Sequence, residues 1–353
     1  MKIISLGIID RHFLIPILGG IIGLMYDIFI IYSPKYEIIV ENPILDNIYV
    51  TFGMILAFIP FLILKNKSKA ENKKYNEQIS KSELYRKLKD SKDVFKKTKF
   101  KKYRFIIYST LFDSFQTLLI SFLTFVYNLW IFDIIFISLF PFLILKTKYY
   151  NHQFISMIFI VVLGLGLNII SYFKYDNTGE QLKSFDIFLQ FISEICFCLS
   201  AVIRKYNMEK NYCNPYELCF WEGFFGFILH SICLTVFCLF ALSANGIQHP
   251  NNLIKYFNKF DYNDLIICLS DIILSFIFNI SIILTCNYFT PIHILIISII
   301  DEANNHLIPD SNLALNILGI FILILITIVF LVFIEVIEIN ICNLSFNIKK
   351  ILN

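Results

Sequence analysis

Long apolar stretches, separated by short polar segments, dominate the pattern of residues along the chain. An α-helix needs about 20 predominantly apolar residues to cross the hydrocarbon core of a bilayer. We therefore expect ten transmembrane helices, at residues 12–32, 46–64, 104–127, 129–146, 153–173, 184–205, 216–241, 262–287, 291–308 and 313–336. The pattern predicts an all-α, polytopic membrane protein.

Two of these stretches are interrupted by polar residues. The stretch 129–146 contains Asp133 and Pro141. The stretch 291–308 contains Asp301, Glu302, Asn304, Asn305 and His306. Polar groups and helix breakers are tolerated at membrane depth only where protein surrounds them. We therefore expect both segments to lie inside the bundle, shielded from lipid.

Composition supports the same class of protein. Of the 353 residues, 57% are hydrophobic and 16% are charged, whereas a soluble domain carries about 25% charged residues. A cleavable signal peptide is not expected, because the first apolar stretch is long enough to span and no small-residue cleavage site follows it. The nine cysteines show no CxxC pair and no Cys/His zinc spacing. We expect them to be buried apolar residues, and we predict no metal site.

The distribution of charge predicts the orientation. Residues 65–104 hold 16 of the 30 lysines and arginines, together with five acidic residues. The positive-inside rule places this basic loop in the cytosol, and both termini with it. A solvated linker is the simplest interpretation, and binding to anionic lipid of the cytosolic leaflet is compatible with it. Nucleic-acid binding is not expected, because the loop holds no folded module.

Similar features recur in the two halves of the sequence. An Asn-Pro dipeptide precedes the second and the seventh stretch, at residues 42–43 and 214–215, and Asp113 and Asp271 lie early in the third and the eighth. Five is an odd number, so a second copy of five helices enters the membrane from the opposite side. Such inverted repeats are typical of secondary transporters, which bind substrate near the midplane between the repeats.

We therefore expect two inverted five-helix repeats. The first covers residues 1–173 and includes the basic cytosolic loop, and the second covers residues 174–353 and ends in a short cytosolic tail.

The segment AVIRKYNMEKNYCNPYELCFWEGFFGF, at residues 201–227, carries a family resemblance. Its features are the basic end of a sixth helix, a short loop with proline and a Glu-Gly-x-x-Gly-Phe-like start of a seventh helix, given by Arg204, Lys205, Tyr206, Pro215, Glu222, Gly223, Gly226 and Phe227. They resemble the drug/metabolite transporter superfamily, closest to the solute carrier 35 group, subfamily F, of nucleotide-sugar-transporter-like membrane proteins. The resemblance covers about residues 104–335. It implies a solute transporter.

Polar residues within the spans are the candidates for function, because an ionisable group inside a membrane is costly unless it has a role or a partner. For a substrate cavity we expect Asp113, Gln116, Glu194, Asp271 and Asn279. Weaker candidates are Asp27, Asp133, Asp301, Glu302 and Asn305. Each acid also has a structural interpretation, in which it satisfies a backbone group.

Glu222 lies near the cytosolic end of the seventh helix. We expect it to reach the interface or to pair with Arg204 or Lys205, which locks the hairpin of the sixth and seventh helices. A gate at the cytosolic mouth is the alternative. Gly223 and Gly226 share one helical face, as do Gly19 and Gly23, and such spacing permits close helix contact.

The expected interior is rich in acids and lacks a deep lysine or arginine. This favours a cation, an uncharged polar solute or proton coupling, and it argues against a nucleotide sugar, whose phosphates need basic groups. Walker, GxGxxG, HExxH and GxSxG motifs do not occur, so neither an enzyme nor a cofactor is expected.

The sequence thus predicts a secondary active transporter of a small organic solute that works by alternating access. The alternative is a non-transporting scaffold or receptor built on the same fold. The expected partners are the solute, protons as a candidate coupling ion, and the lipid bilayer. An endomembrane such as the Golgi, vacuole or lysosome is favoured over the plasma membrane. The oligomeric state is not predicted.

Overall fold

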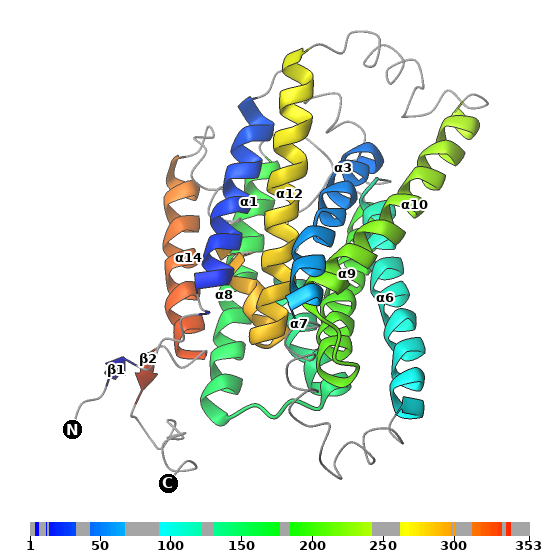
Figure 1. Ribbon diagram of the computed structural model, residues 1–353. Helices are drawn as coiled ribbons and strands as arrows, with labels where there is room; N and C mark the ends of the chain where they lie inside the picture. Colours follow the sequence, from blue (N-terminus) through cyan, green and yellow to red (C-terminus); the bar gives the residue numbers. More distant parts are fainter. Residues whose placement is uncertain are drawn as a thin grey trace, which may run out of the picture.

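A computed structural model describes residues 4–6, 12, 14–32, 43–67, 92–121, 130–176, 184–241, 262–297, 299–300, 313–333 and 337–339. Nearly all of these residues are helical (Figure 1). Two short strands, β1 (Ile4–Leu6) and β2 (Ile337–Ile339), pair antiparallel with Ile4 opposite Ile339. This pairing brings together segments near the two ends of the chain. The fold is all-α, as the sequence predicts.

The helices are α1 (Leu14–Tyr32), α3 (Pro43–Ile55), α6 (Lys92–Ser121), α7 (Trp130–Phe140), α8 (Asn151–Asp176), α9 (Ser184–Lys210), α10 (Pro215–Ala241), α12 (Tyr262–Tyr288) and α14 (Leu313–Phe333). A π-helical segment, η2 (Pro141–Leu145), continues α7, and a 3₁₀ segment, η3 (Pro291–Ile294), follows α12. Both segments begin at a proline, which lacks the N–H that an α-helix needs.

Six of the described helices are long and apolar enough to cross a membrane, at Ile44–Lys67, Asn151–Ile170, Phe185–Lys210, Pro215–Val236, Cys268–Tyr288 and Leu315–Phe333. Each coincides with an expected stretch, so the protein is a multi-pass integral membrane protein. The described apolar helices Leu14–Met25 and Phe132–Leu145 are shorter. Residues 301–308 of the expected ninth helix lie outside the described part of the chain.

The helix that begins with α3 is interrupted near its middle. Leu56 and Ala57 form a turn, and a second helical segment runs from 58 to 67. Pro60 explains this break, because its ring collides with the carbonyl of Leu56, four residues earlier. The amides of Leu56 and Ala57 instead bond to carbonyls three residues back, at 2.9 and 3.1 Å.

The helices pack in a pattern that repeats across the bundle. The helix α6 packs against α9, and α1 packs against α12. The helix α3 lies between α10 and α12, and α8 packs against α14 (Figure 1). The helix α7 packs beside α8 and α9, and its Ile134 and Ile137 are buried. The expectation that the whole stretch 129–146 is shielded is wrong for its second part, because the side chains of Leu139, Phe142, Leu143 and Ile144 are exposed.

Small residues allow the closest helix contacts. A Cβ added at Gly223 of α10 would lie 2.6 Å from the Cβ of Met54, and one added at Gly226 would lie 2.8 Å from the Cγ2 of Thr51. Both contacts are with α3. Gly19 and Gly23 of α1 face α12 in the same way. The close contacts expected from the glycine spacing are therefore confirmed.

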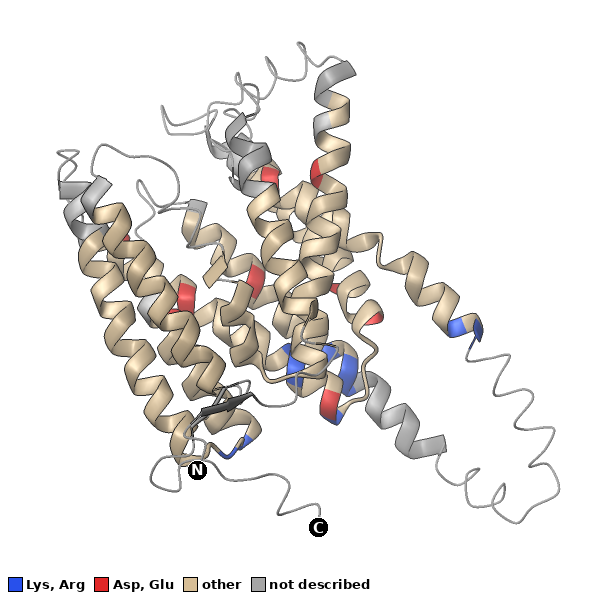
Figure 2. Cartoon of the chain, turned by 90° about the vertical axis from the view of Figure 1, so that its left-hand side faces the viewer, with Lys and Arg blue, Asp and Glu red and all other residues tan. Residues whose placement is uncertain are grey.

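Positive charge gathers at one end of the bundle. Every lysine and arginine whose side chain the structure describes lies in residues 65–67, 101–104, 146–148 or 204–210. These segments lie towards the lower end of the bundle in Figure 2, which we call the basic end. Most of the acidic residues in the described part of the chain lie nearer the middle or the opposite end (Figure 2).

Candidate functional site

A cavity of about 350 Å³ lies inside the bundle between α1, α3, α6, α9 and α12. Its polar lining is Asp46, Asn47, Asp113, Gln116, Thr117, Arg204, Ser275 and Asn279. Asp46 lies in the first turn of α3, whereas Arg204 lies two turns before the end of α9. Since α3 begins at the end opposite the basic one (Figure 1), the cavity extends from that end towards the basic end.

Three of the five expected cavity residues line this space. They are Asp113 and Gln116 on α6 and Asn279 on α12. Asp271 is not a lining residue, although it lies on the same helix as Asn279. It is 1% exposed, and the Ser275 hydroxyl donates to its Oδ1 at 3.3 Å.

Glu194 also lies away from the cavity lining. It faces Asp133 of α7, and the two carboxyl groups share a hydrogen bond. Asp133 Oδ1 also lies 3.8 Å from the Sγ of Cys198. The side chains of Asp27, Asp301, Glu302 and Asn305 lie outside the described residues.

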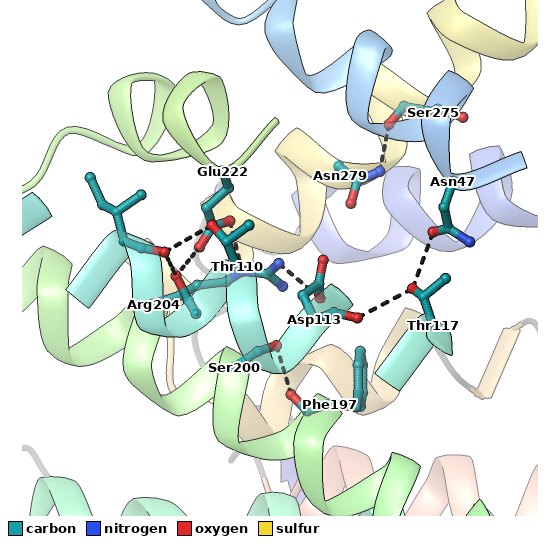
Figure 3. A network of polar contacts seen from close by, with 12 residues as sticks. Asn47, Thr110, Asp113, Thr117, Phe197, Ser200, Arg204, Glu222, Ser275 and Asn279 are labelled. Atoms are coloured by element: carbon teal, nitrogen blue, oxygen red, sulfur yellow. Dashed lines mark hydrogen bonds and ion pairs between the residues drawn. The ribbon is translucent and has the colours of Figure 1, made fainter. Parts of the chain in front are cut away.

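Arg204 connects the cavity to the basic end. Its Nε donates to Glu222 Oε2 at 2.9 Å, and its Nη2 lies 3.1 Å from Asp113 Oδ1 (Figure 3). The hydroxyl of Ser109 donates to the other oxygen of Glu222. One guanidinium therefore joins α9, α10 and α6. Arg204 and Glu222 are buried, at 3% and 2% exposed, and of the two carboxylates that pair with Arg204 only that of Asp113 lines the cavity.

The expectation that the interior lacks a deep arginine is wrong. It rested on ending the sixth span at residue 205, so that Arg204 fell at the edge of the membrane. Instead α9 continues to Lys210. Arg204 is 3% exposed and pairs with two carboxylates inside the bundle, which offset the cost of removing its charge from water.

Glu222 has one of the two partners that the sequence predicts. It pairs with Arg204 and does not reach the interface. Lys205, the other expected partner, contacts the carbonyl of Asn287 and the carboxylate of Glu209, both at 3.1 Å. Glu222 thus joins the α9–α10 hairpin, and through Ser109 it also holds α6.

The link between α9 and α10 is built by local sequence signals. Pro215 is the first residue of α10, where its missing N–H has no cost. The side chain of Asn214 caps the helix by accepting a hydrogen bond from the amide of Tyr216 at 2.9 Å. Cys213 is packed beneath this turn, and burial raises the pKa of its thiol to about 12, with Glu217 and Glu222 also raising it.

The cavity wall opposite Arg204 consists of weaker contacts. The Thr117 hydroxyl lies 3.3 Å from Asn47 Oδ1 on α3 and 3.2 Å from the carbonyl of Asp113 (Figure 3). On α12, Asn279 donates its amide N–H to the carbonyl of Ser275 at 2.9 Å. Sequence reasoning missed Asn47, Thr117 and Ser275. Thr117 lies four residues after Asp113, and Ser275 lies four residues after Asp271. Residues at this spacing share a helical face, so the sequence could have indicated these two.

Comparison of the chain with models of known protein families gives no match, and comparison with characterised proteins gives none either. Among the described residues, no group of three His, Cys, Asp or Glu side chains is placed to hold a metal ion.

Proposed function

We propose that the protein is a secondary transporter that moves a small organic solute across a membrane by alternating access. One observation carries this proposal. The polar cavity inside the bundle is lined by α1, α3 and α6 from residues 1–173 and by α9 and α12 from residues 174–353. Secondary transporters bind their substrates between two such halves, near the middle of the membrane.

Ten helices in two inverted repeats are part of the proposal. In two such repeats, α1, α3, α6 and α8 of the first half correspond, in that order, to α9, α10, α12 and α14 of the second. Replacing each helix by its counterpart then turns the α1–α12 contact into the α9–α6 contact. It also turns the α3–α12 contact into the α6–α10 contact. The contacts α3–α10 and α8–α14 map onto themselves. All of these contacts are present, which supports a two-fold relation between the halves.

Local contacts support the same relation. The expected alignment of Asp113 with Asp271 also aligns Thr117 with Ser275. Each hydroxyl bonds within its own helix to the aspartate four residues earlier, Thr117 to the carbonyl oxygen of Asp113 and Ser275 to the carboxylate of Asp271. The resemblance to the drug/metabolite transporter superfamily, and within it to the solute carrier 35 group, supports the same architecture.

The two ends of the cavity support an alternating mechanism. Towards the basic end, the contacts of Arg204 with Glu222 and Asp113 and the glycine contacts between α10 and α3 close the bundle. The lining reaches the opposite end at Asp46. The positive-inside rule assigns the basic end to the cytosol, so this conformation is closed towards the cytosol. We place both termini in the cytosol, and the protein in an endomembrane.

Transport and the conformational change can be tested together. The full chain in proteoliposomes is given a mixture of amines, amino acids, nucleosides and sugars, and the trapped solutes are identified by mass spectrometry. Spin labels at Lys65→Cys and Tyr212→Cys, both exposed positions at the basic end, report its opening. We expect uptake of one class of solute and two label distances whose populations shift when that solute is added.

A control pair on one helix separates motion from label disorder. Labels at Phe185→Cys and Lys210→Cys, both exposed on α9, should keep one distance throughout. A single unchanged distance for the basic-end pair, together with no uptake, would contradict transport. That outcome would favour the scaffold or receptor alternative.

A further inference from the structure

We propose that the cavity binds a small organic cation, an ammonium group on an apolar or aromatic body, with the Asp113 carboxylate as its counter-ion. This inference rests on the proposed function and deepens it by naming the class of solute. It follows from the charge, the polar groups and the aromatic rings that line the cavity.

The charge balance at the cavity is negative. Asp46, Asp113 and Arg204 are its ionisable lining residues. Arg204 is already paired with buried Glu222, at 2.9 Å. Around Arg204, the described residues therefore set one cation against two carboxylates, those of Asp113 and Glu222. In a low-dielectric interior such an excess is costly, and a bound cation lowers this cost. A phosphate or carboxylate group would add to the excess.

Asp113 is the carboxylate that a solute can reach. Its side chain is 35% exposed, whereas that of Glu222 is 2% exposed. One of its oxygens contacts Arg204, and the other oxygen has no hydrogen bond to the described residues (Figure 3). An ammonium group at this second oxygen shares Asp113 with Arg204 and leaves the Arg204–Glu222 pair intact.

Two amide side chains complete a polar site. Gln116 lies three residues after Asp113 on α6 and lines the same cavity. Asn279 uses its N–H on the carbonyl of Ser275, so its oxygen remains available as an acceptor. An ammonium group carries three donors and no acceptor. One carboxylate and two amide oxygens match that requirement.

Aromatic rings supply the apolar part of the site. Phe197 of α9 and Phe278 of α12 line the cavity beside these polar groups. The ring of Phe278 also packs against Gly23 of α1, where an added Cβ would lie 2.9 Å from its Cε2. Ring faces attract cations through their negative quadrupole. The cavity volume, about 350 Å³, lies within the range of small-molecule sites.

Three probes of matched size test the charge requirement. They are phenethylammonium, 2-phenylethanol and 3-phenylpropanoate, which share a phenyl ring and a short chain. Binding to the purified full chain is measured by titration calorimetry. We expect the cation to bind at least tenfold more tightly than the alcohol, and the anion not to bind. Asp113→Asn should weaken binding of the cation at least tenfold.

Asp271→Asn is the matched control, because Asp271 is the same residue type on α12 and does not line the cavity. Its affinity for the cation should stay within about twofold of that of the unmodified chain. Phe278→Leu provides a second test if Asp113→Asn fails to fold. It should weaken binding of the cation several-fold more than binding of the alcohol.

Equal or tighter binding of the alcohol or the anion would overturn the inference. Unchanged affinity in Asp113→Asn, or no binding of any probe to the folded protein, would do the same. Uptake into proteoliposomes separates this inference from the proposed function. Binding that depends on Asp113 without uptake would leave the cation site standing and remove transport. Uptake of anionic solutes would leave transport standing and remove the cation site.

Discussion

The two ends of the bundle use the same helices in different ways. At the basic end, α3, α6, α9 and α10 meet through glycine contacts and through a buried ion pair between Arg204 and Glu222. Towards the other end, α3, α6 and α9 separate around a cavity, where amides and hydroxyls meet at about 3.3 Å.

This difference indicates where the molecule is fixed and where it can respond to a ligand. The buried pair has no water to replace a lost partner, so each charge depends on the other. The cavity contacts are longer and partly exposed, so a solute can replace them at small cost. Asp113 belongs to both regions, since it contacts Arg204 and lines the cavity.

The largest contrast that we expect is in cysteine reactivity at the two ends. Burial raises the pKa of the Cys213 thiol to about 12, so near neutral pH almost none of it is the reactive thiolate. A cysteine introduced by Asn47→Cys would line the cavity, where water and a small reagent can reach it. At pH 8 we expect a water-soluble maleimide to modify it at least about a hundredfold faster than Cys213.

Mass spectrometry can measure this contrast, because it reports the modification of each cysteine separately. Modification of Cys213 should accelerate about tenfold for each pH unit between pH 7 and 9, since its thiolate fraction rises by that factor. Comparable rates at the two positions would show that the basic end is open to water.

Breaking the buried ion pair should give the largest loss of stability. Glu222→Ala leaves the Arg204 guanidinium buried with only the Asp113 carboxylate, which is shared with the cavity. Removing one partner of a buried pair costs about 3–5 kcal/mol. The free energy of unfolding in detergent should fall by this amount. The double variant Arg204→Met, Glu222→Leu should recover most of the loss, because no unpaired buried charge remains at the α9–α10 contact. A loss below about 1 kcal/mol in Glu222→Ala would show that the pair is exposed to solvent.

The glycine contacts should show an intermediate effect. Gly223→Ala brings a methyl group to 2.6 Å from the Cβ of Met54 and 2.8 Å from the backbone carbonyl of Thr51. Overpacking of this kind costs about 1–3 kcal/mol. Gly166→Ala on α8 is the control, because its methyl meets only the end of the Ile322 side chain, at 3.3 Å. Thermal unfolding should separate the two variants, and equal midpoints would contradict a close α3–α10 contact.

The sequence predicts the contacts at the basic end better than it predicts the cavity. Glycine spacing on a single helix indicates a face where another helix can approach, and the contacts of Gly223 and Gly226 confirm it. Arg204 and Lys205 are the two expected partners of Glu222, because both lie close to it along the chain, and Arg204 is the one that pairs with it. Long apolar stretches likewise predict the helices that span the membrane.

The cavity depends on which helices meet, and that information is not local. Glu194 lies in the middle of its helix, yet it faces Asp133 on α7 and does not line the cavity. Arg204 was placed at the membrane edge because hydropathy treats each charge as unpaired. Phe197 carries no signal that separates it from the many other phenylalanines of the chain. Only the packing of α9 against α6 and α12 brings it to the cavity wall.

The smallest effect that we expect is at the cavity wall. Thr117→Val removes the contact with Asn47 Oδ1 at 3.3 Å. A neutral hydrogen bond contributes about 0.5–1.5 kcal/mol to stability, and this long one should lie at the lower limit. Thr235→Val on α10 is the control, because its exposed hydroxyl bonds only to the carbonyl of Ser231, four residues earlier. The two variants should differ by less than about 1 kcal/mol in the free energy of unfolding. A larger loss in Thr117→Val would show that the wall between α3 and α6 is as firmly held as the basic end, and the contrast between the two ends would then disappear.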